Sequence, residues 1–216
     1  MLRFLSLFVI AAIATGQLYN TSLFSPGANL IVNPTFSTPD IGGVMTQYYT
    51  PGGISGWTFP NGQIVTISTL CTFFVGSPCL TNATQGFDLD VSFFYELLSQ
   101  AVSITNSAQY LLTVEWLEAV VSPIGKSFEI KINSTSLANI TITTNNYTGN
   151  VNQYIVNGSP GLMNISFQQF GAPPDGLGPL MTGIYLQELL PIGAPPPPPP
   201  PPVVPPVVPP AVPQST

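Results

Sequence analysis

The feature that most limits what this chain can fold into is a two-residue alternation of side chains along short segments. In residues 109–121 one face of an extended chain would carry Leu112, Val114 and Trp116, and the other Leu111, Thr113, Glu115 and Leu117. Successive side chains of a strand point to opposite faces, so this period is typical of strands. Similar segments lie at 29–32, 63–70, 127–132, 140–144, 154–156, 163–167 and 183–189, with proline- and glycine-rich breaks between them. The pattern predicts an all-β, antiparallel β-sandwich, in which only 92–103 is compatible with a helix and its end resembles a strand.

The two ends of the chain differ from this middle part. Residues 1–16 have one basic residue, a short apolar run and small residues at their end, which is typical of a secretory signal peptide. The apolar run is shorter than the about 20 residues that a spanning helix needs, although an uncleaved anchor is the alternative. We therefore expect a signal peptide at 1–16, a β-sandwich domain at 24–190 and a proline-rich tail at 191–216, in a secreted protein with no membrane span after cleavage.

The tail is built almost entirely of proline, valine and alanine. Proline cannot donate to a sheet or continue a helix, so the tail is predicted to form polyproline II, at about 3.1 Å per residue. It would serve as a spacer, as a hydroxylated and O-glycosylated wall anchor, or as a ligand of proline-binding domains.

The charge of the chain excludes several classes of function. It has 3 lysines and arginines against 9 carboxylates, and Arg3 lies in the leader, so nucleic acid is not an expected partner. It has no histidine. Catalytic nucleophiles activated by histidine and metal sites with histidine ligands are therefore excluded.

The chain has two cysteines, Cys71 and Cys79, close together in the sequence. In a secreted protein such a pair is predicted to form a disulfide, worth about 2–3 kcal/mol through loop closure. A reactive thiol is the alternative, but no lysine or histidine lies beside either sulfur in the sequence to lower its pKa.

Asparagines followed by x-Ser/Thr are frequent. The acceptor sequons for N-glycosylation are Asn20, Asn82, Asn133, Asn139, Asn146, Asn157 and Asn164. Some arise by chance in an Asn- and Thr-rich sequence, but glycans would keep a charge-poor domain soluble. We expect several to be occupied in a eukaryotic host.

A series of short motifs resembles the galactose-binding-domain-like β-sandwiches, which include family-4-like carbohydrate-binding modules and a group of secreted plant cell-wall proteins of unknown function. The motifs are NLIVNPTF from Asn29, ISGW ending at Trp57, GFDLD from Gly86, LSQAV from Leu98, AQYLL from Ala108 and GIYL from Gly183. The resemblance implies a jelly-roll sandwich that binds carbohydrate. Large rings stabilise most when they are buried, so Trp57, Phe36 and Trp116 are interpreted as core residues.

In this family a glutamate after the phenylalanine and an aspartate near the last strand often help to bind a structural calcium. The matching positions here are Ser37 and Thr182-Gly183, which carry no carboxylate. We therefore expect no cofactor and no metal, while Asp88 and Asp90 with backbone carbonyls leave a calcium site as the alternative.

No pair of carboxylates forms a convincing catalytic site. Glu115 and Glu118 lie three residues apart, on opposite faces of a strand. Asp88 and Asp90 share a face about 7 Å apart, but turn capping or hydroxyl binding explains them equally well. We therefore predict that the protein is not an enzyme.

The favoured function is a non-catalytic glycoprotein that binds polysaccharide in a cell wall or extracellular matrix. The candidate ligand-binding residues are Phe73, Phe74, Phe93, Tyr95, Asp88 and Asp90. The alternative is a structural glycoprotein of a surface coat or fibre, with self-association through the sandwich and a proline-rich stalk. One fold hosts both uses, so the fold alone does not choose between them.

Overall fold

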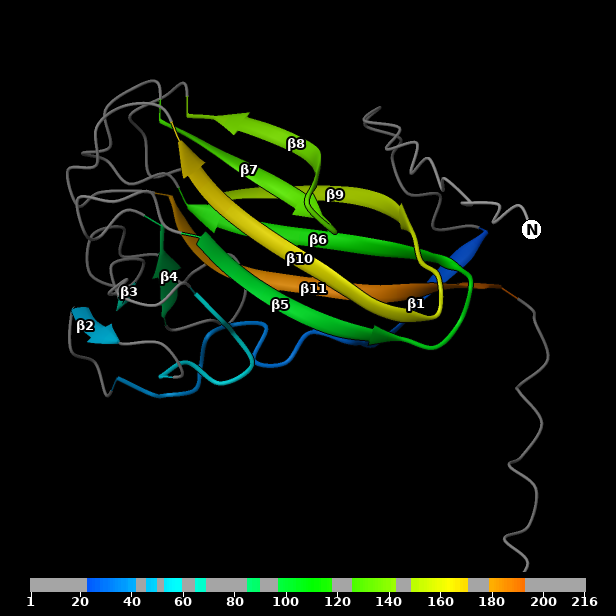
Figure 1. The fold of residues 1–216 in the computed structure, drawn as a ribbon, viewed down its shortest axis with the longest axis horizontal. Helices are drawn as coiled ribbons and strands as arrows, with labels where there is room; N and C mark the ends of the chain where they lie inside the picture. The colour runs from blue at the N-terminus through cyan, green and yellow to red at the C-terminus, as the bar shows by residue number, and fades with distance from the viewer. Residues whose placement is uncertain are drawn as a thin grey trace, which may run out of the picture.

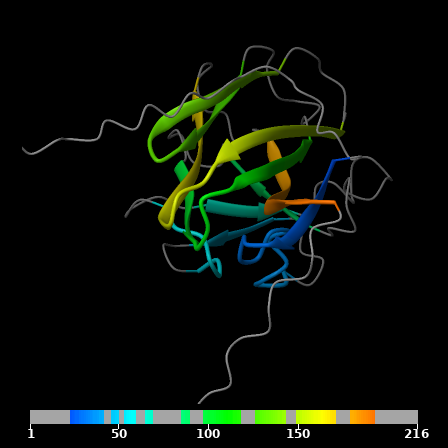
Figure 2. The same cartoon turned by 90° about the vertical axis from the view of Figure 1, so that its right-hand side faces the viewer.

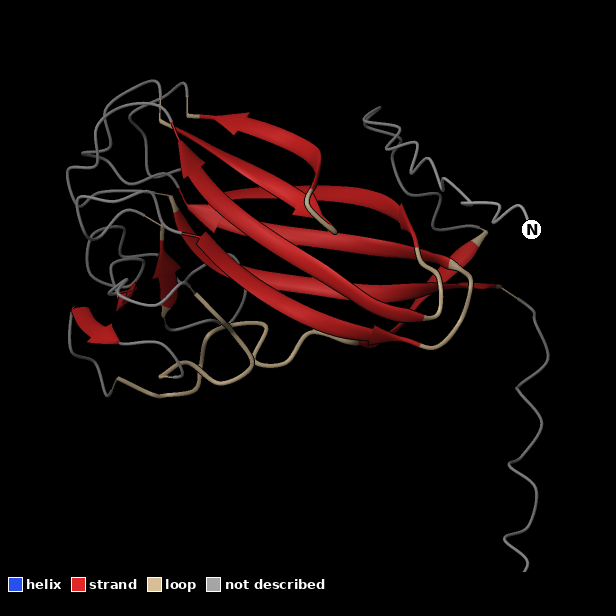
Figure 3. Cartoon of the chain, in the orientation of Figure 1, coloured by secondary structure: helices blue, strands red, loops and turns tan. Residues whose placement is uncertain are grey.

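A computed structural model gives the structure of the chain. It describes residues 23–41, 46–49, 53–59, 65–68, 85–89, 97–117, 126–142, 149–170 and 179–192. All regular structure in these segments is β-strand (Figure 3). In this part of the chain there is no helix long and apolar enough to cross a membrane.

The described residues form eleven strands. They are β1 (Phe24–Asn29), β2 (Thr46–Tyr49), β3 (Val65–Ser68), β4 (Gly86–Asp88), β5 (Leu97–Ile104), β6 (Gln109–Leu117), β7 (Ser127–Ile132), β8 (Thr135–Thr141), β9 (Gly149–Asn157), β10 (Gly161–Phe170) and β11 (Leu180–Pro191).

The strands make two antiparallel sheets (Figure 1). The larger, seven-stranded sheet has the order β2-β3-β4-β11-β6-β9, with β1 also paired to β11; the smaller sheet has the order β5-β10-β7-β8. β2, β3 and β4 gather at one end of the molecule, and β1 lies beside the end of β11 at the other (Figures 1 and 2).

The core lies between the two sheets and is rich in aromatic rings. The ring of Trp57 is 5.4 Å from that of Phe36 and 6.3 Å from that of Phe167, measured between centroids. Trp57 is 2% exposed and Trp116 is 3% exposed, which confirms that both are core residues. Two antiparallel sheets around one shared core are the arrangement of a β-sandwich, as predicted from the alternation.

The loop after β1 is held by side chains from other parts of the chain. Gln100 on β5 accepts a hydrogen bond from Val32 N at 2.7 Å and donates one to Val32 O at 3.0 Å. Asn33 has a φ of 52°, and its carbonyl accepts a hydrogen bond from Trp57 Nε1 at 3.1 Å. The motifs around Asn29 and Trp57 therefore fix a long loop against the core.

The sequence located the strands better than it located their ends. The strand at 127–132 is confirmed, and β9, β10 and β11 extend beyond their predicted bounds. The prediction of a strand at 29–32 is wrong, because the strand ends at Asn29. There, Asn29 Oδ1 accepts hydrogen bonds from Ile31 N at 3.2 Å and Leu186 N at 3.0 Å, so a side chain replaces part of the backbone pairing. The segment 97–104 is a strand.

Several predictions lie outside the described residues. They concern the signal peptide at 1–16, the Cys71–Cys79 disulfide, nearly all of the tail at 191–216, and residues 92–96. These stay predictions.

Candidate binding surface on the larger sheet

The predicted ligand-binding residues are only partly covered by the structure. Phe73, Phe74, Phe93, Tyr95 and Asp90 lie outside the described residues, as do the sequons at Asn20, Asn82 and Asn146. Asp88 lies on β4, opposite Leu180 of β11, and is 4% exposed. Its role in binding stays a prediction.

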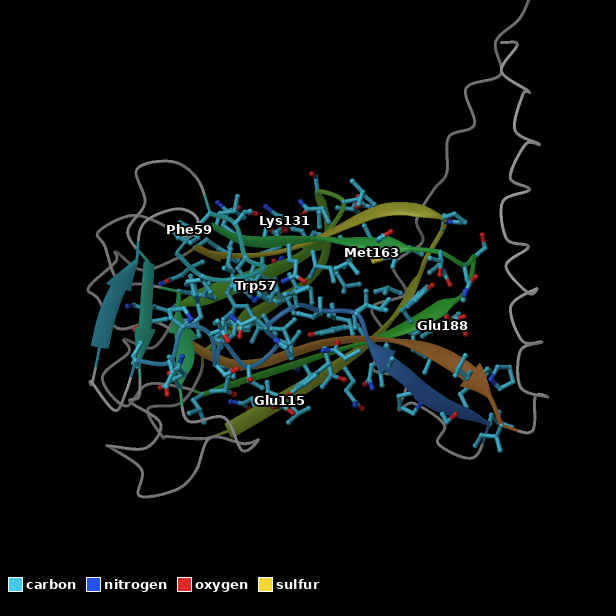
Figure 4. All side chains as sticks on the ribbon, turned by 90° about the horizontal axis from the view of Figure 1, so that it is seen from below. Trp57, Phe59, Glu115, Lys131, Met163 and Glu188 are labelled. Carbon is cyan, nitrogen blue, oxygen red and sulfur yellow. The ribbon has the colours of Figure 1, made fainter. Side chains whose placement is uncertain are left out.

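The side of the larger sheet that faces away from the core carries a group of polar and aromatic residues, which we call the outer face of the larger sheet. Leu112, Val114 and Trp116 of β6 belong to the core, so the alternate residues Thr113 and Glu115 point to this outer face, as predicted. Figure 4 shows Glu115 on the opposite side of the sheet from Trp57.

Two cross-strand rows define this outer face. In the first row Tyr185 of β11 lies opposite Thr113 of β6, which lies opposite Gln153 of β9. The second row has Gly183, Glu115 and Val151 in the same three strands. Neighbouring strands are about 4.8 Å apart, so each row brings its side chains within reach of one small ligand.

Gly183 lets the side chains of the two rows come together. A Cβ atom at this position would lie 2.5 Å from Glu115 Oε2 and 2.9 Å from Tyr185 Cε2. The carboxylate and the ring edge therefore both lie against the backbone of β11 at Gly183. Any larger residue would force at least one of them away.

The neighbouring residues supply neutral hydrogen-bonding groups. Gln153 Nε2 donates a weak hydrogen bond to Thr113 Oγ1 at 3.4 Å. Thr113 is buried, Tyr185 is partly exposed, and Gln153 and Val151 are exposed. The surface thus presents the ring of Tyr185 and the amide of Gln153 beside the Glu115 carboxylate, whose Oε2 is buried. An aromatic ring next to hydrogen-bonding groups on a rigid sheet is the chemistry of a site for a polyhydroxylated ligand.

Asp88 shares this outer face at its margin. Its neighbour Phe87 lies in the core, and Asp88 pairs with Leu180, which in turn pairs with Leu117 of β6. Asp88 is therefore separated from Glu115 by one intervening strand and is buried. The predicted aspartate and the carboxylate on β6 belong to one sheet face.

The smaller sheet has a different outer face. Lys131 Nζ lies 2.8 Å from Glu129 Oε2 and donates a hydrogen bond to Gln168 Oε1 at 2.9 Å. Hydrogen bonds from Lys131 and then Ser136, with the positive charge of Lys131, lower the pKa of Glu129, and partial burial opposes them. The sequon asparagines Asn133, Asn139 and Asn164 are exposed in the same sheet, and Asn157 is exposed at the end of β9.

The loop around Ser37, where the family that the sequence resembles would bind calcium, is held by the side-chain amide of Gln85. Gln85 Nε2 donates hydrogen bonds to the carbonyls of Phe36 and, at 2.7 Å, Pro39, and Gln85 Oε1 accepts one from Ile41 N at 3.3 Å. These carbonyls therefore have an amide donor where a cation would need them as ligands. Within the described segments no group of three Asp, Glu, Cys or His side chains is placed to hold a metal ion.

The alternation places Glu115 on the strand face opposite Trp116, but the sequence does not connect Glu115 with Tyr185. The alternation in 109–117 gives the face of Glu115, and the closing motif contains both Gly183 and Tyr185. What the sequence lacks is the register between β6 and β11, which lie far apart in the chain. The sequence contains both the glycine, Gly183, and the carboxylate, Glu115, but it does not show that they lie opposite each other.

No family model matches the chain, and no curated protein matches it. Its fold is similar to solved structures of carbohydrate-binding modules. One is TmCBM61 in complex with β-1,4-galactotriose, with 15% identity, a TM-score of 0.44, and coverage of 75% of this chain and 99% of that one. The second is the CBM35 from Paenibacillus barcinonensis, with 16% identity, a TM-score of 0.38, and coverage of 66% of this chain and 98% of that one.

A third similar structure is a family 35 module from Clostridium thermocellum. It has 11% identity and a TM-score of 0.41, and the match covers 61% of this chain and 92% of that one. These modules belong to the class that the sequence motifs resemble. At such identities and TM-scores the likeness assigns neither a ligand nor an activity to this chain.

Proposed function

We propose that this protein is a secreted, non-catalytic glycoprotein that binds carbohydrate in a cell wall or extracellular matrix, through the outer face of the larger sheet. The observation that carries the proposal is the placement of Tyr185 and Glu115 on either side of Gly183. Sugar rings stack their C–H faces on aromatic rings, and their hydroxyls need hydrogen-bond partners beside that ring. Tyr185, Glu115 and Gln153 would provide both from three adjacent strands.

The rigidity of the support favours this assignment. β6 pairs with β11 along residues 180–188 and with β9 along its whole length, so the two rows are fixed by backbone hydrogen bonds on both sides. A site on strands is positioned more accurately than one on loops, and less conformational entropy is lost on binding.

The non-catalytic part of the proposal rests on the carboxylates. Hydrolysis of a glycosidic bond uses two carboxyl groups that flank the bond, one of them a proton donor. On this outer face Glu115 lies at the centre, whereas Asp88 is buried at the margin. With no histidine in the chain, nothing here supports an activated nucleophile.

Secretion, glycosylation and the wall or matrix setting rest on the sequence. The leader at 1–16, the sequons and the proline-rich tail support them, and the tail would act as a polyproline II spacer. The jelly-roll, galactose-binding-like assignment is supported by the motif order. Three of the four exposed sequons that the structure describes lie in or next to the smaller sheet, where glycans would leave the outer face of the larger sheet accessible, and the fourth, Asn157, lies at the end of β9, four residues from Gln153.

The alternative of self-association is favoured by one observation. The exposed apolar residues Leu23, Leu190 and Ile192 lie where β1 pairs with the end of β11. Apolar patches of this kind mark contact sites between chains. Size-exclusion chromatography of the secreted protein would show a concentration-dependent dimer under this alternative, and Leu190→Ser would abolish it.

Binding is tested with the secreted full chain on a panel of insoluble polysaccharides. Tyr185→Ala should weaken retention about tenfold, which corresponds to about 1.4 kcal/mol. The matched control is Phe170→Ala, which removes an aromatic ring that is exposed at the end of β10 in the other sheet. If both variants bind like the wild type, the assigned surface is wrong.

A further inference from the structure

The outer face of the larger sheet has a marked imbalance of charge. We infer that it selects neutral glycans, whose sugars carry only hydroxyl and acetal oxygens, and rejects glycans rich in uronate or sulfate. This inference rests on the proposed function, because it specifies the ligand class of that same surface.

The lysines that the structure describes lie away from this surface. The chain has three basic side chains, Arg3, Lys126 and Lys131, and no histidine. Arg3 belongs to the leader, Lys126 is 0% exposed, and Lys131 lies on the outer face of the smaller sheet, 2.8 Å from Glu129 (Figure 4). Recognition of a carboxylate or sulfate relies on arginine or lysine at the contact. Neither of the two lysines that the structure describes lies on the proposed surface.

Glu115 places a negative charge at the centre of the surface. The carboxylate of Glu115 is held against β11 at the position of Gly183, beside the ring of Tyr185, with its Oε2 buried there and the residue as a whole partly exposed. A carboxylate accepts hydrogen bonds from sugar hydroxyls, and such charge-assisted bonds are stronger than neutral ones. A uronate at the same place would meet a like charge, and this repulsion would act against the wrong ligand.

The remaining groups do not change this selection. Gln153 offers an exposed amide, which both donates and accepts hydrogen bonds and so suits a sugar hydroxyl in either role. Thr113 is buried and accepts a weak hydrogen bond from that amide. Val151, which is 53% exposed, adds an apolar contact next to Glu115.

The first experiment is affinity electrophoresis of the secreted full chain in native gels that contain one polysaccharide each. The neutral probes are β-1,4-galactan, xyloglucan and galactomannan, and the acidic probes are polygalacturonate and alginate. Each gel is run with added calcium and with a chelator, because a bound cation could bridge Glu115 to a uronate. We expect at least one neutral polymer to retard the protein and neither acidic polymer to do so.

The outcomes separate the two proposals. Retardation by an acidic polymer, with or without calcium, would overturn the neutral selectivity and leave carbohydrate binding intact. No retardation by any polymer would overturn carbohydrate binding itself, and the selectivity with it.

The second experiment adds a cation to each face. Gln153→Lys places an ammonium group on the proposed surface, and Leu162→Lys adds the same charge on β10, at a residue of the smaller sheet that is 75% exposed. Gln153→Lys should produce retardation by polygalacturonate at low salt that the wild type does not show, and this gain should be lost at high salt. Leu162→Lys should give no such gain. Equal gains would show that net charge rather than this surface rejects acidic polymers.

Discussion

The outer faces of the two sheets differ in the side chains that they expose. The smaller sheet carries a salt-bridged lysine, Lys131, and three exposed sequon asparagines. The larger sheet carries Tyr185 and Glu115 around a glycine. The same antiparallel geometry thus supports one outer face with exposed sequons and one that we propose as the ligand-binding face. The difference comes from a few outward positions, because the inward positions of both sheets are needed for the core.

The largest effect is expected from a residue that supports both faces. Trp57 lies in the core between the sheets and contacts Phe36 and Phe167. Trp57→Ala should lower the free energy of unfolding by about 3–5 kcal/mol, because it leaves a cavity and removes large apolar area from burial. Urea unfolding followed by circular dichroism measures this. A loss below about 1 kcal/mol would contradict the role of Trp57 as a core anchor.

Gly183→Ala affects only the larger sheet. The new Cβ would meet only the far ends of the Glu115 and Tyr185 side chains, which can move aside, so stability should change by less than about 1 kcal/mol, whereas their displacement should lower polysaccharide retention tenfold or more. Leu162→Ala removes apolar surface from the smaller sheet and should change neither quantity. Unchanged binding in Gly183→Ala would show that the geometry at this glycine is irrelevant to the ligand.

Glycans provide a direct way to compare the two faces. In a eukaryotic secretory host, glycopeptide mass spectrometry should find Asn139 and Asn164 occupied. The double change Gln153→Asn and Ile155→Thr creates a sequon on the larger sheet, and its glycan should abolish polysaccharide retention by steric exclusion. Asn139→Gln, which removes a native sequon, should leave retention intact. If retention survives in the double variant while mass spectrometry shows its new sequon to be glycosylated, the ligand binds elsewhere.

The smallest effect is expected at the salt bridge of the smaller sheet. The pKa of Glu129 is lowered from the usual 4.5 by its hydrogen bonds and by Lys131, so its contribution to stability is complete above that pH and is lost as pH falls through the lowered value. Glu129→Gln should therefore reduce stability at neutral pH by less than about 1 kcal/mol. The stability of the variant should also fall less than that of the wild type as the pH is lowered. Thermal unfolding measured between neutral and acidic pH tests this, and an identical pH profile in wild type and variant would contradict it.

Much of the fold could be predicted from the sequence, because the alternation of side chains directly reports which face of a strand is buried. Residues 127–132 and the two faces of 109–117 follow from it, whereas the burial of Trp57 and Trp116 follows from the size of their rings. The end of β1 could not be predicted, since it depends on a hydrogen bond between Asn29 and the distant Leu186. The candidate surface was missed for the same reason, because the pairing of Glu115 with Gly183 is a property of register between distant strands.

The position of β11 has a mechanical consequence. β11 pairs with β6 on one edge and with β1 and β4 on the other, and the chain continues from its last residue, Pro191, into the proline-rich tail (Figure 1). If the tail were tethered, tension would act along the axis of β11, and the backbone hydrogen bonds to β1 and β6 would have to shear together rather than open one at a time. Tyr185 lies on this strand, so a load carried between a bound polymer and the tail would run through the strand that pairs with three others, β1, β4 and β6.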